Sequence, residues 1–539
     1  MNGAEPNRMS RLVAALALLI LTACSSSTTA TLVAVYSLQR HGARNVLPKG
    51  ILLTEGDLIG GPTLLPEGQY QTYTAGAAFR ARYIDAATCA AASTCLAVAG
   101  GAANSSSGGA GVVKYGVINQ PDVQFGNWDT YVRSSALDRT IMSGLCFFNG
   151  IFPADPAAVS AGRYLPTGAQ VVPVYTQSDA DDILIRAYTK CPAYQAALSD
   201  WFRSAEFAAQ EAASGPLRAE VQAAMPATDT SLQNWWNVYD RINVWRTYGV
   251  GDRTPNFTDA QFAKIQSLAY WLETTKMRSN MTRSLLGGPT LGDLLSQLQA
   301  AANAVRTGAQ YYYKLLSLSG HYNTQLGVLA ALELDAYPPA ANFTWFRNIP
   351  KLAAVMAFEL HAAAAPAAAG GAAGSGATEF FVRLVAQDGP TAPYVTLPLP
   401  CEGAAAAAAV GAGACRLEDF VAYAAPRALS SAAEWCAACG NMGVSACRMA
   451  QLTAQGGGGS SSSDWKIAVS VVVTAVGVAL LAGLAAWLWV RRRTASPAAA
   501  AAEYGGTGGG GAASGGGSKG QLQAELAGAQ FRYGLANTI

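Results

Sequence analysis

An uncharged apolar run from Ile467 to Val490 constrains this chain more than any other feature of its sequence. At about 1.5 Å per residue, a helix over this run is long enough to cross the hydrocarbon core of a bilayer. Arg491, Arg492 and Arg493 follow it at once, whereas Lys466 alone precedes it. The positive-inside rule then places residues 491–539 in the cytosol. The sequence therefore predicts one transmembrane helix over 467–490, after a Gly/Ser stalk over 456–466 and before a disordered cytosolic tail.

The N-terminus has the pattern of a secretory signal peptide over residues 1–24. Arg8 and Arg11 form a basic segment, and the apolar run that follows, 12–21, is too short to span a bilayer. The segment ending at Cys24 (LTAC) also resembles a bacterial lipobox, in which that cysteine is lipidated, but the predicted spanning helix argues against it. We expect a single-pass type I membrane protein whose ectodomain faces the cell exterior or an endosomal or lysosomal lumen.

The region between these segments, residues 31–455, is predicted to be one globular ectodomain. Thr31 to Leu38 (TLVAVYSL) has the pattern of a buried parallel strand, and a helix is predicted from Pro66 to about Tyr83. Residues 190–310 are mostly helical by pattern, with aromatic residues at helical spacing that we expect in the core. The net charge of +2 gives no indication of a nucleic-acid partner. The sequence indicates no oligomeric state.

The cysteines and glycosylation sequons agree with an exported ectodomain. Nine cysteines besides Cys24 precede the apolar run, as do four N-x-S/T sequons, at Asn104, Asn256, Asn280 and Asn342. Because nine is odd, at least one thiol is free, and we predict that it is Cys146, which lies in an apolar stretch. The pair Cys436 and Cys439, spaced C-x-x-C, is expected to form disulfides rather than a zinc site.

The chain has three histidines, and the surroundings of one indicate chemistry. His41 follows the predicted strand and lies between Arg40 and Arg44. Two guanidiniums would repel a metal ion, but they bind phosphate oxygens bidentately, and a neutral imidazole between them can attack phosphorus. A basic turn with a structural histidine is the alternative. His361, beside an Ala tract, is expected to be a loop histidine without a role.

Several segments in order extend this interpretation. They are RHGAR (40–44), LLPEGQYQTYTAGAAFRARY (64–83), YVRSSALDRTIMSGLCFFNGIFP (131–153), TKCPAY (189–194), LGGPTLGDLLSQLQ (286–299), LLSLSGHYNTQLGVLAALEL (315–334), MAFEL (356–360), FFVRLV (380–385) and CRLEDFVAYA (415–424). Over about residues 31–447 this series resembles the histidine acid phosphatase family, branch 2 of the histidine phosphatase superfamily. The resemblance implies a doubly wound α/β sheet with helices on both faces and a smaller α-helical cap over about 190–310.

The resemblance also implies the chemistry. His41 would be the nucleophile that becomes phosphorylated, and the phosphoryl group would be bound by Arg40, Arg44, Arg133 and His321. The substrates would be small phosphomonoesters, with no metal and no cofactor. Cys191 falls at a disulfide position of the family, with Cys436, Cys439 and Cys447 as candidate partners, and Cys401 and Cys415 bracket an Ala-rich loop and form another candidate pair.

One departure from the family concerns the proton donor. The family's second histidine is followed by Asp or by Ala-Glu, whereas here Tyr322 and Asn323 follow His321. A positioned acid typically contributes about 10²–10⁴-fold to such a reaction, so its loss should slow alkyl phosphates most. Three interpretations stay open. Tyr322 itself donates; a carboxylate from elsewhere does, with Asp138, Glu333 and Asp335 as candidates; or the ectodomain is a weak or inactive phosphatase that binds phosphorylated ligands.

Overall fold

The computed structural model describes residues 30–456, with gaps at 48–60, 97–113, 116–117, 120–124, 155, 163–164, 250–254, 278–279, 310–312 and 365–377. The predicted signal peptide (1–24), spanning helix (467–490) and tail (491–539), and nearly all of the predicted stalk, lie outside these residues. None of the helices described is both long enough and apolar enough to cross a bilayer. One compact unit ends at Val444, and helix α17, Ser445–Gly456, belongs to a second unit.

The centre of the first unit is a mixed sheet with the strand order β10-β8-β7-β1-β6-β4-β5, and β9 pairs with β8. Its strands are β1 (Thr31–Arg40), β4 (Thr130–Ser135), β5 (Tyr175–Gln177), β6 (Leu315–Gly320), β7 (Val355–Ala364), β8 (Thr378–Gln387), β9 (Tyr394–Leu397) and β10 (Cys415–Arg416). The predicted strand over 31–38 is confirmed as β1, which continues to Arg40.

The prediction of a doubly wound sheet holds only for the parallel half, which consists of β1, β6, β4 and β5. The other pairs, β1 with β7, β7 with β8, and β8 with β9 and β10, are antiparallel. For β8 and β9 the reason is the short connection from Gln387 to Tyr394, which can join only antiparallel neighbours, whereas a parallel pair needs a long crossover.

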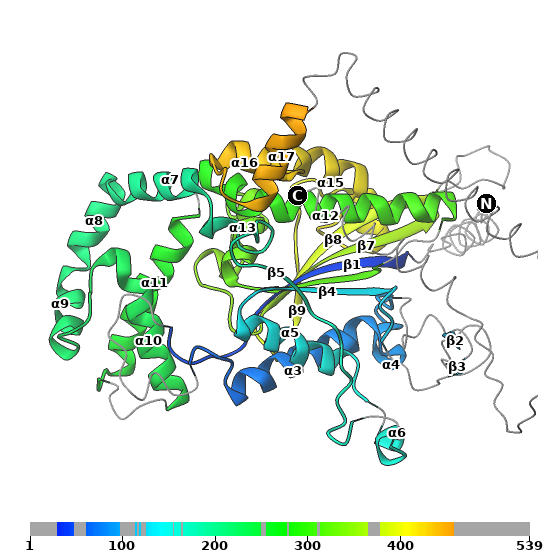
Figure 1. The fold of residues 1–539 in the computed structure, drawn as a ribbon, viewed down its shortest axis with the longest axis horizontal. Helices are drawn as coiled ribbons and strands as arrows, with labels where there is room; N and C mark the ends of the chain where they lie inside the picture. The colour runs from blue at the N-terminus through cyan, green and yellow to red at the C-terminus, as the bar shows by residue number, and fades with distance from the viewer. Residues whose placement is uncertain are drawn as a thin grey trace, which may run out of the picture. The chain divides into compact units, whose positions relative to one another are not determined.

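Helices cover both faces of the sheet (Figure 1). On one face lie α3 (Pro66–Tyr83), which confirms the predicted helix, and α5 (Asp138–Ile151). Gly76 and Gly150 let the two helix backbones touch, since a Cβ on either would overlap the other helix. The core beneath them combines Phe79 of α3 and Phe147 of α5 with strand residues such as Val35. On the other face lie α12 (Asn280–Thr307), α13 (Tyr322–Ala331) and α15 (Leu417–Ala424).

A group of helices beside the sheet forms a cap with its own core. They are α7 (Pro192–Phe202), α8 (Ala205–Ala213), α9 (Gly215–Ala224), α10 (Trp235–Tyr248) and α11 (Asp259–Thr275). Trp235 and Trp245 are buried there, as expected for the aromatic residues of this region. The cap is shorter than the predicted 190–310. Helix α12 instead packs across the sheet, where Tyr36 of β1 donates a 2.8 Å hydrogen bond to Asp293.

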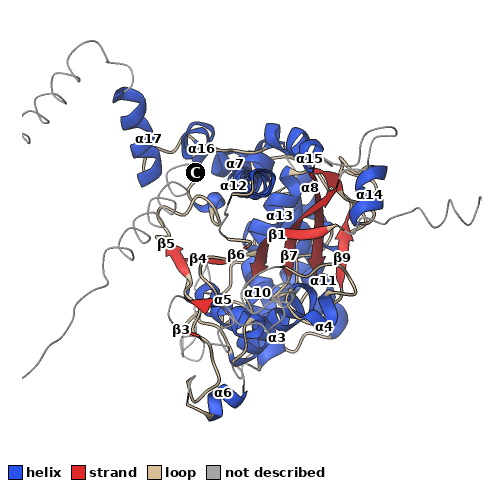
Figure 2. Ribbon diagram, turned by 90° about the vertical axis from the view of Figure 1, so that its right-hand side faces the viewer, coloured by secondary structure: helices blue, strands red, loops and turns tan. Residues whose placement is uncertain are grey.

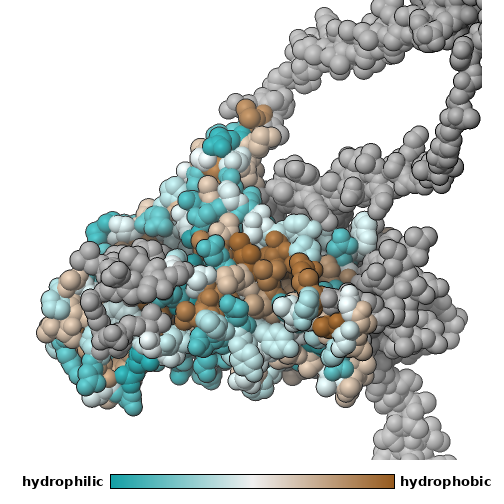
Figure 3. Space-filling model, turned by 60° about the horizontal axis from the view of Figure 1, so that its bottom comes forward, coloured by the Kyte–Doolittle hydropathy of each residue, from teal (hydrophilic) through white to brown (hydrophobic). Residues whose placement is uncertain are grey.

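The remaining elements are short. They are α4 (Ala86–Cys89), β2 (Lys114–Tyr115), β3 (Ile118–Asn119), α6 (Pro156–Ser160), η2 (Ala187–Thr189), η3 (Leu232–Asn234), η4 (Thr344–Phe346), α14 (Ala404–Val410), η5 (Ala425–Arg427) and α16 (Ala432–Cys439). Figure 2 shows helices on both sides of the strands in a view turned by 90°. Figure 3 shows apolar residues gathered in the middle of one face with polar residues around them, which is ordinary for a protein surface.

The disulfides of the first unit tie separate segments together. Cys191 pairs with Cys439, one of its three candidate partners, and the predicted pair Cys401–Cys415 is confirmed. A third disulfide joins Cys89 and Cys95. Cys146 is a free thiol, as predicted.

Candidate active site

The segments around His41 and His321 meet at one edge of the sheet because their strands, β1 and β6, are parallel neighbours. Arg40 at the end of β1 lies in register with Gly320 at the end of β6. His41 and His321 are the next residues, so both side chains start from the same edge, and the His41 N–H donates a 3.1 Å hydrogen bond to the Gly320 carbonyl. The two imidazole centroids are 5.7 Å apart with their planes at 70°.

The His41 imidazole is arranged as a nucleophile. Its Nδ1 atom lies 2.8 Å from the Gly42 carbonyl oxygen, which can only accept, so Nδ1 carries the hydrogen and Nε2 keeps a free lone pair. Burial lowers the pKa of His41 well below its usual value, and the positive charges of Arg139 and Arg40 lower it further. The ring is therefore neutral in mildly acidic solution, which is the form that can attack phosphorus.

The loop that carries His41 is held between α3 and α5. The Gly42 N–H donates to Ser143 Oγ of α5 at 3.0 Å, and the Ala43 N–H donates to Gln71 Oε1 of α3 at 2.9 Å. Gly42 and Gly68 allow this approach, because a Cβ on Gly42 would overlap the backbone of Gly68. These contacts fix the direction in which the His41 ring leaves the strand.

Arg40 and Arg44 both line a cavity of about 330 Å³ between the sheet and the cap. The Arg40 guanidinium donates to the Pro350 carbonyl, and its Cζ atom lies 5.0 Å from the centre of the Tyr322 ring. Arg44 Nη2 donates a 2.8 Å hydrogen bond to Asp240 of the cap. The structure thus brings these two predicted arginines together beside His41.

Arg139 is a further cation of this cluster that the sequence analysis missed. It lies in the first turn of α5, and its carbonyl accepts a 2.6 Å hydrogen bond from Ser143, the residue that holds Gly42. Burial lowers the pKa of Arg139 to about 10, and the neighbouring charge of Arg44 contributes to the same shift. A cation in the first turn of a helix opposes the helix dipole, so this placement is a signal in the sequence that could have identified it.

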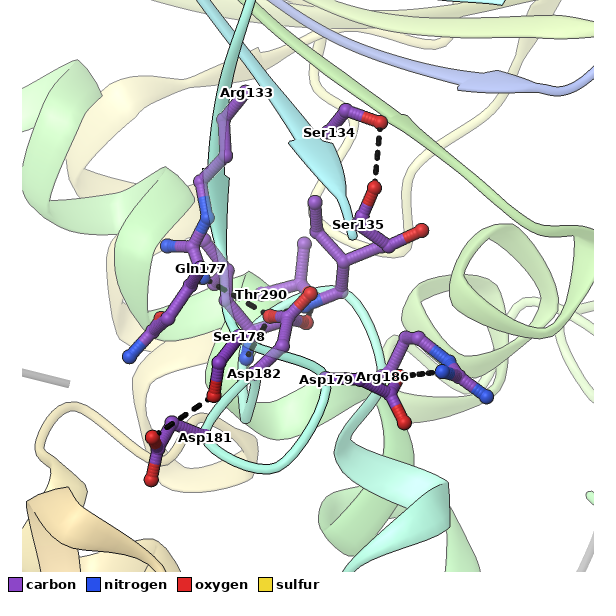
Figure 4. A network of polar contacts seen from close by, with 12 residues as sticks. Arg133, Ser134, Ser135, Gln177, Ser178, Asp179, Asp181, Asp182, Arg186 and Thr290 are labelled. Carbon is purple, nitrogen blue, oxygen red and sulfur yellow. Dashed lines mark hydrogen bonds and ion pairs between the residues drawn. The ribbon is translucent and has the colours of Figure 1, made fainter. Parts of the chain in front are cut away.

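Arg133, in contrast, is not brought to His41. Its Nη2 atom donates to Gln177 Oε1 at 2.6 Å and to Asp182 Oδ1 at 3.0 Å, as Figure 4 shows. Arg133 lies two residues before the end of β4, in register with Tyr175 of β5, and its guanidinium reaches Gln177 at the end of β5 and Asp182 in the turn that follows. Asp182 is fully buried and also accepts hydrogen bonds from the Leu184 and Ile185 N–H groups.

His321 is fixed by residues from β4 and α5. Its Nε2 atom lies 3.0 Å from Ser135 Oγ, which in turn lies 2.9 Å from Thr140 Oγ1. Ser135 is the last residue of β4, the strand that pairs with β6. This chain of hydrogen bonds holds the second imidazole buried next to His41.

Tyr322 does not have the surroundings of a proton donor. Its hydroxyl donates a 2.6 Å hydrogen bond to Glu273 Oε2 of α11, and Lys276 Nζ lies 2.5 Å from the same oxygen. Burial raises the pKa of Tyr322 well above its usual value, and the Glu273 carboxylate raises it further. Tyr322, like His41 and His321, is not among the residues that line the cavity, so it is the bound hydroxyl that argues against it as a donor.

The three carboxylates considered in the sequence also lie elsewhere. Glu333 binds Arg427 at 2.9 Å, Asp335 binds Arg283 at 3.0 Å, and Asp138 is exposed at the start of α5. None of them lines the cavity. The prediction that His361 is a loop residue is wrong, because it lies buried in β7, 3.2 Å from Glu359. Within the described ranges no three His, Cys, Asp or Glu side chains gather to hold a metal ion.

Comparison with known families gives one extensive match. The family described as the histidine phosphatase superfamily (branch 2) matches residues 49–387. Lysosomal acid phosphatase of Xenopus laevis is 27% identical over 41% of this chain and 49% of its own length. Lysosomal acid phosphatase of Homo sapiens is 26% identical over 38% of this chain and 48% of its own length. The chain thus aligns with about half the length of these curated relatives.

Solved structures also match, at lower sequence identity. A phytase from Klebsiella covers 74% of this chain and 95% of its own, at 14% identity and a TM-score of 0.47. A multiple inositol polyphosphate phosphatase of Bifidobacterium longum in complex with phosphate covers 79% of this chain and 96% of its own, at 13% identity and a TM-score of 0.42.

Proposed function

The chain belongs to branch 2 of the histidine phosphatase superfamily, and we propose that it is an acid phosphatase that hydrolyses small phosphomonoesters through a phosphohistidine on His41. One observation carries the proposal. The buried His41 imidazole directs its Nδ1 hydrogen to the Gly42 carbonyl, which leaves Nε2 free to attack, and the charges of Arg139, Arg40 and Arg44 act on the ring. This is an arrangement that binds a dianion and presents a nucleophile to it.

In the proposed binding step the three arginines and His321 hold the oxygens of the phosphoryl group. Arg44 and Arg40 line the cavity, and the charge of Arg139 acts on both His41 and Arg44. Guanidiniums that are already held in a buried site need little rearrangement when charge develops on the phosphoryl oxygens. Arg139 thus takes the role that the family resemblance suggested for Arg133.

In the first chemical step, His41 Nε2 attacks phosphorus while the bond to the leaving oxygen breaks, and that oxygen takes up a proton. In the second step, water attacks the phosphohistidine, the P–N bond breaks, and phosphate leaves with the original imidazole restored. Neither step calls for a metal ion or a cofactor, so we propose that the reaction is metal-independent.

We also propose that the catalytic unit is exported and anchored by residues 467–490. The disulfides Cys191–Cys439 and Cys401–Cys415 support an oxidising compartment. Two of the relatives are named lysosomal acid phosphatases, which supports a lumen of the endosomal or lysosomal kind as well as the cell exterior. Antibody access to an epitope tag at each end of the full chain, in intact and in permeabilised cells, tests this topology.

Turnover of p-nitrophenyl phosphate at pH 5 by the full chain in detergent tests the activity. We expect turnover that the His41→Ala variant loses and that a chelator leaves unchanged. Quenching the reaction in alkali with denaturant should trap a phosphoryl group on the wild type that survives in alkali and is lost in acid, as expected of phosphohistidine. If wild type and His41→Ala behave alike while both bind phosphate, the protein is instead a non-catalytic binding ectodomain, an alternative that the placement of Tyr322 favours.

A further inference from the structure

Because Tyr322 follows His321 and its hydroxyl is bound to Glu273, the leaving oxygen needs a proton from another side chain. We propose that Asp240, on helix α10, gives the leaving oxygen its proton, in place of the acid that the family carries after its second histidine. This inference rests on the proposed function, since it names a further catalytic residue of the same site.

Asp240 lies beside Arg44, one of the arginines of the proposed phosphate site. It lines the same cavity as Arg40 and Arg44, and its Oδ1 atom is 2.8 Å from Arg44 Nη2. Its charge also acts on Arg139, so the carboxylate lies close to this part of the phosphate-binding cluster. Among the described residues that line the cavity, Asp240 is the one that carries a carboxyl group.

The alternative donor, Tyr322, has its hydroxyl engaged in another contact. Its hydroxyl binds Glu273, and Glu273 is balanced by Lys276. Its ring packs against the Arg40 guanidinium at 5.0 Å and against Trp236, with ring centroids 5.2 Å apart. These contacts make Tyr322 a positioning residue for the Arg40 guanidinium.

Substrate binding changes the charge balance around Asp240. In the free protein its negative charge is matched by Arg44, with Arg139 also near, and the cavity contains Arg40 and Lys351. A phosphoryl dianion on the same arginines uses their positive charge and adds negative charge beside the carboxylate. Like charges that share a site favour protonation of one of them, which is the condition that the proposed donor needs.

The step then balances. His41 Nε2 forms the bond to phosphorus, the P–O bond to the leaving group breaks, and the leaving oxygen takes the Asp240 proton, which leaves a carboxylate. In the second step the attacking water gives one proton to that carboxylate as its oxygen binds phosphorus and the P–N bond breaks. Asp240 thus ends the cycle as a carboxyl group, which ionises again once phosphate has left Arg44.

The decisive variant is Asp240→Asn in the full chain, because an amide oxygen still accepts the hydrogen bond from Arg44. Values of kcat/KM are compared for p-nitrophenyl phosphate, whose leaving group needs no proton, and for benzyl phosphate, which leaves as an alkoxide. These values report only steps up to formation of the phosphohistidine, so the common second step does not obscure the comparison. In this variant we expect kcat/KM to fall by about 10²–10⁴-fold for benzyl phosphate and by about tenfold at most for p-nitrophenyl phosphate.

The pH profile gives a second readout. The decline of kcat/KM at high pH, where the proton donor is ionised, should be present for benzyl phosphate in the wild type and absent in Asp240→Asn. If Asp240 only holds Arg44, its substitution would lower kcat/KM for both substrates by the same factor and leave the shapes of both pH profiles unchanged. This result would overturn the proposal. Asp240→Glu, which retains a carboxyl group, should recover part of the benzyl phosphate activity.

Three further comparisons complete the test. Asp259 is an exposed cap aspartate that pairs with Arg246, and Asp259→Asn should leave kcat/KM for both substrates unchanged. A selective loss of benzyl phosphate activity in Tyr322→Phe or Glu273→Gln, rather than in Asp240→Asn, would assign the proton to that pair and contradict the proposal. So would a wild type that turns over p-nitrophenyl phosphate but not benzyl phosphate. Equal turnover by wild type and His41→Ala would refute the proposed function itself.

Discussion

The Nη2 atom of Arg133 lies 3.0 Å from the Oδ1 atom of Asp182, in an ion pair whose carboxylate is fully buried. Because Asp182 also accepts two backbone N–H groups, the pair fixes the turn that follows β5. Arg133 therefore holds this turn, and Arg139 is the arginine of this segment whose charge acts on His41.

The two arginines should respond differently to substitution. Arg139→Ala removes a charge-assisted contact to the phosphoryl group, worth about 1.5–3 kcal/mol, and should lower kcat/KM for p-nitrophenyl phosphate by roughly 10–150-fold. The unfolding midpoint should change little, since neighbouring cations repel Arg139. Arg133→Met leaves Asp182 unpaired and should cost about 3–5 kcal/mol of stability. Urea unfolding and steady-state kinetics on both variants check this. Loss of activity in Arg133→Met with little effect in Arg139→Ala would show that Arg133, not Arg139, binds the phosphoryl group.

Mildly acidic solution should not inactivate His41 by protonating it. Because burial and the nearby arginines keep the pKa of His41 well below its usual value, the loss of kcat/KM caused by its protonation should occur well below pH 6.5. A profile of kcat/KM for p-nitrophenyl phosphate between pH 3 and pH 8 measures it. A midpoint near pH 6.5 on the acid side would show that His41 is solvated in solution.

The same shift predicts a change in stability with pH. Below about pH 6.5 the unfolded chain binds a proton at residue 41 that the folded protein does not bind. Stability is therefore lost as the pH falls from 6.5 toward the lower pKa of the folded state. Thermal unfolding at pH 7 and pH 5 should show a smaller decrease in His41→Gln than in the wild type. An equal decrease in both would contradict this assignment.

The contact between the His41 loop and α3 should not tolerate an added methyl group. In Gly68→Ala the new Cβ would overlap the backbone of Ala43, and a displacement of about 1 Å in a catalytic group can lower activity by 10²-fold. We expect kcat/KM to fall by about that factor, and stability by about 1–3 kcal/mol from overpacking. Gly215→Ala is the matched control, since nothing lies within 4 Å of its Cβ position. Normal activity in Gly68→Ala would mean that the contact with α3 does not determine the position of the His41 loop.

A second buried carboxylate should matter for stability alone. Glu359 of β7 accepts hydrogen bonds from Arg82 at 2.6 Å, Tyr83 at 2.7 Å and Arg383 at 2.6 Å, and it is not among the residues lining the cavity. Burial alone would raise the pKa of Glu359, but its hydrogen bond with His361 and the two arginines hold that pKa far below its usual value.

Glu359→Ala should therefore cost about 3–5 kcal/mol of stability, because it leaves buried cations unpaired. The contribution of Glu359 is present at neutral pH and is lost as the pH falls below its usual value of about 4.3 toward the folded value. Glu379→Ala removes a pair with the more exposed Arg416 and should cost about 0–1 kcal/mol. Urea unfolding measures both, and kcat/KM per folded molecule should match the wild type.

The sequence by itself determined the local elements of this protein. The apolar run after Thr31 and the proline at position 66 predict β1 and α3, and both are confirmed. His41 between two arginines is likewise a local pattern. Because it directly follows a predicted strand, it can be identified from the sequence as a candidate phosphate site. The roles of these residues in catalysis remain predictions.

Only the tertiary structure decided which other residues reach His41. Parallel pairing of β1 with β6 and of β6 with β4 puts His321 and Ser135 at one edge. Two residues further back on β4, Arg133 meets Asp182 instead. The choice between Arg133 and Arg139, and between Tyr322 and Asp240, depends on strand register and on how the cap packs. Those are set by contacts between residues distant in the chain, which no local pattern encodes.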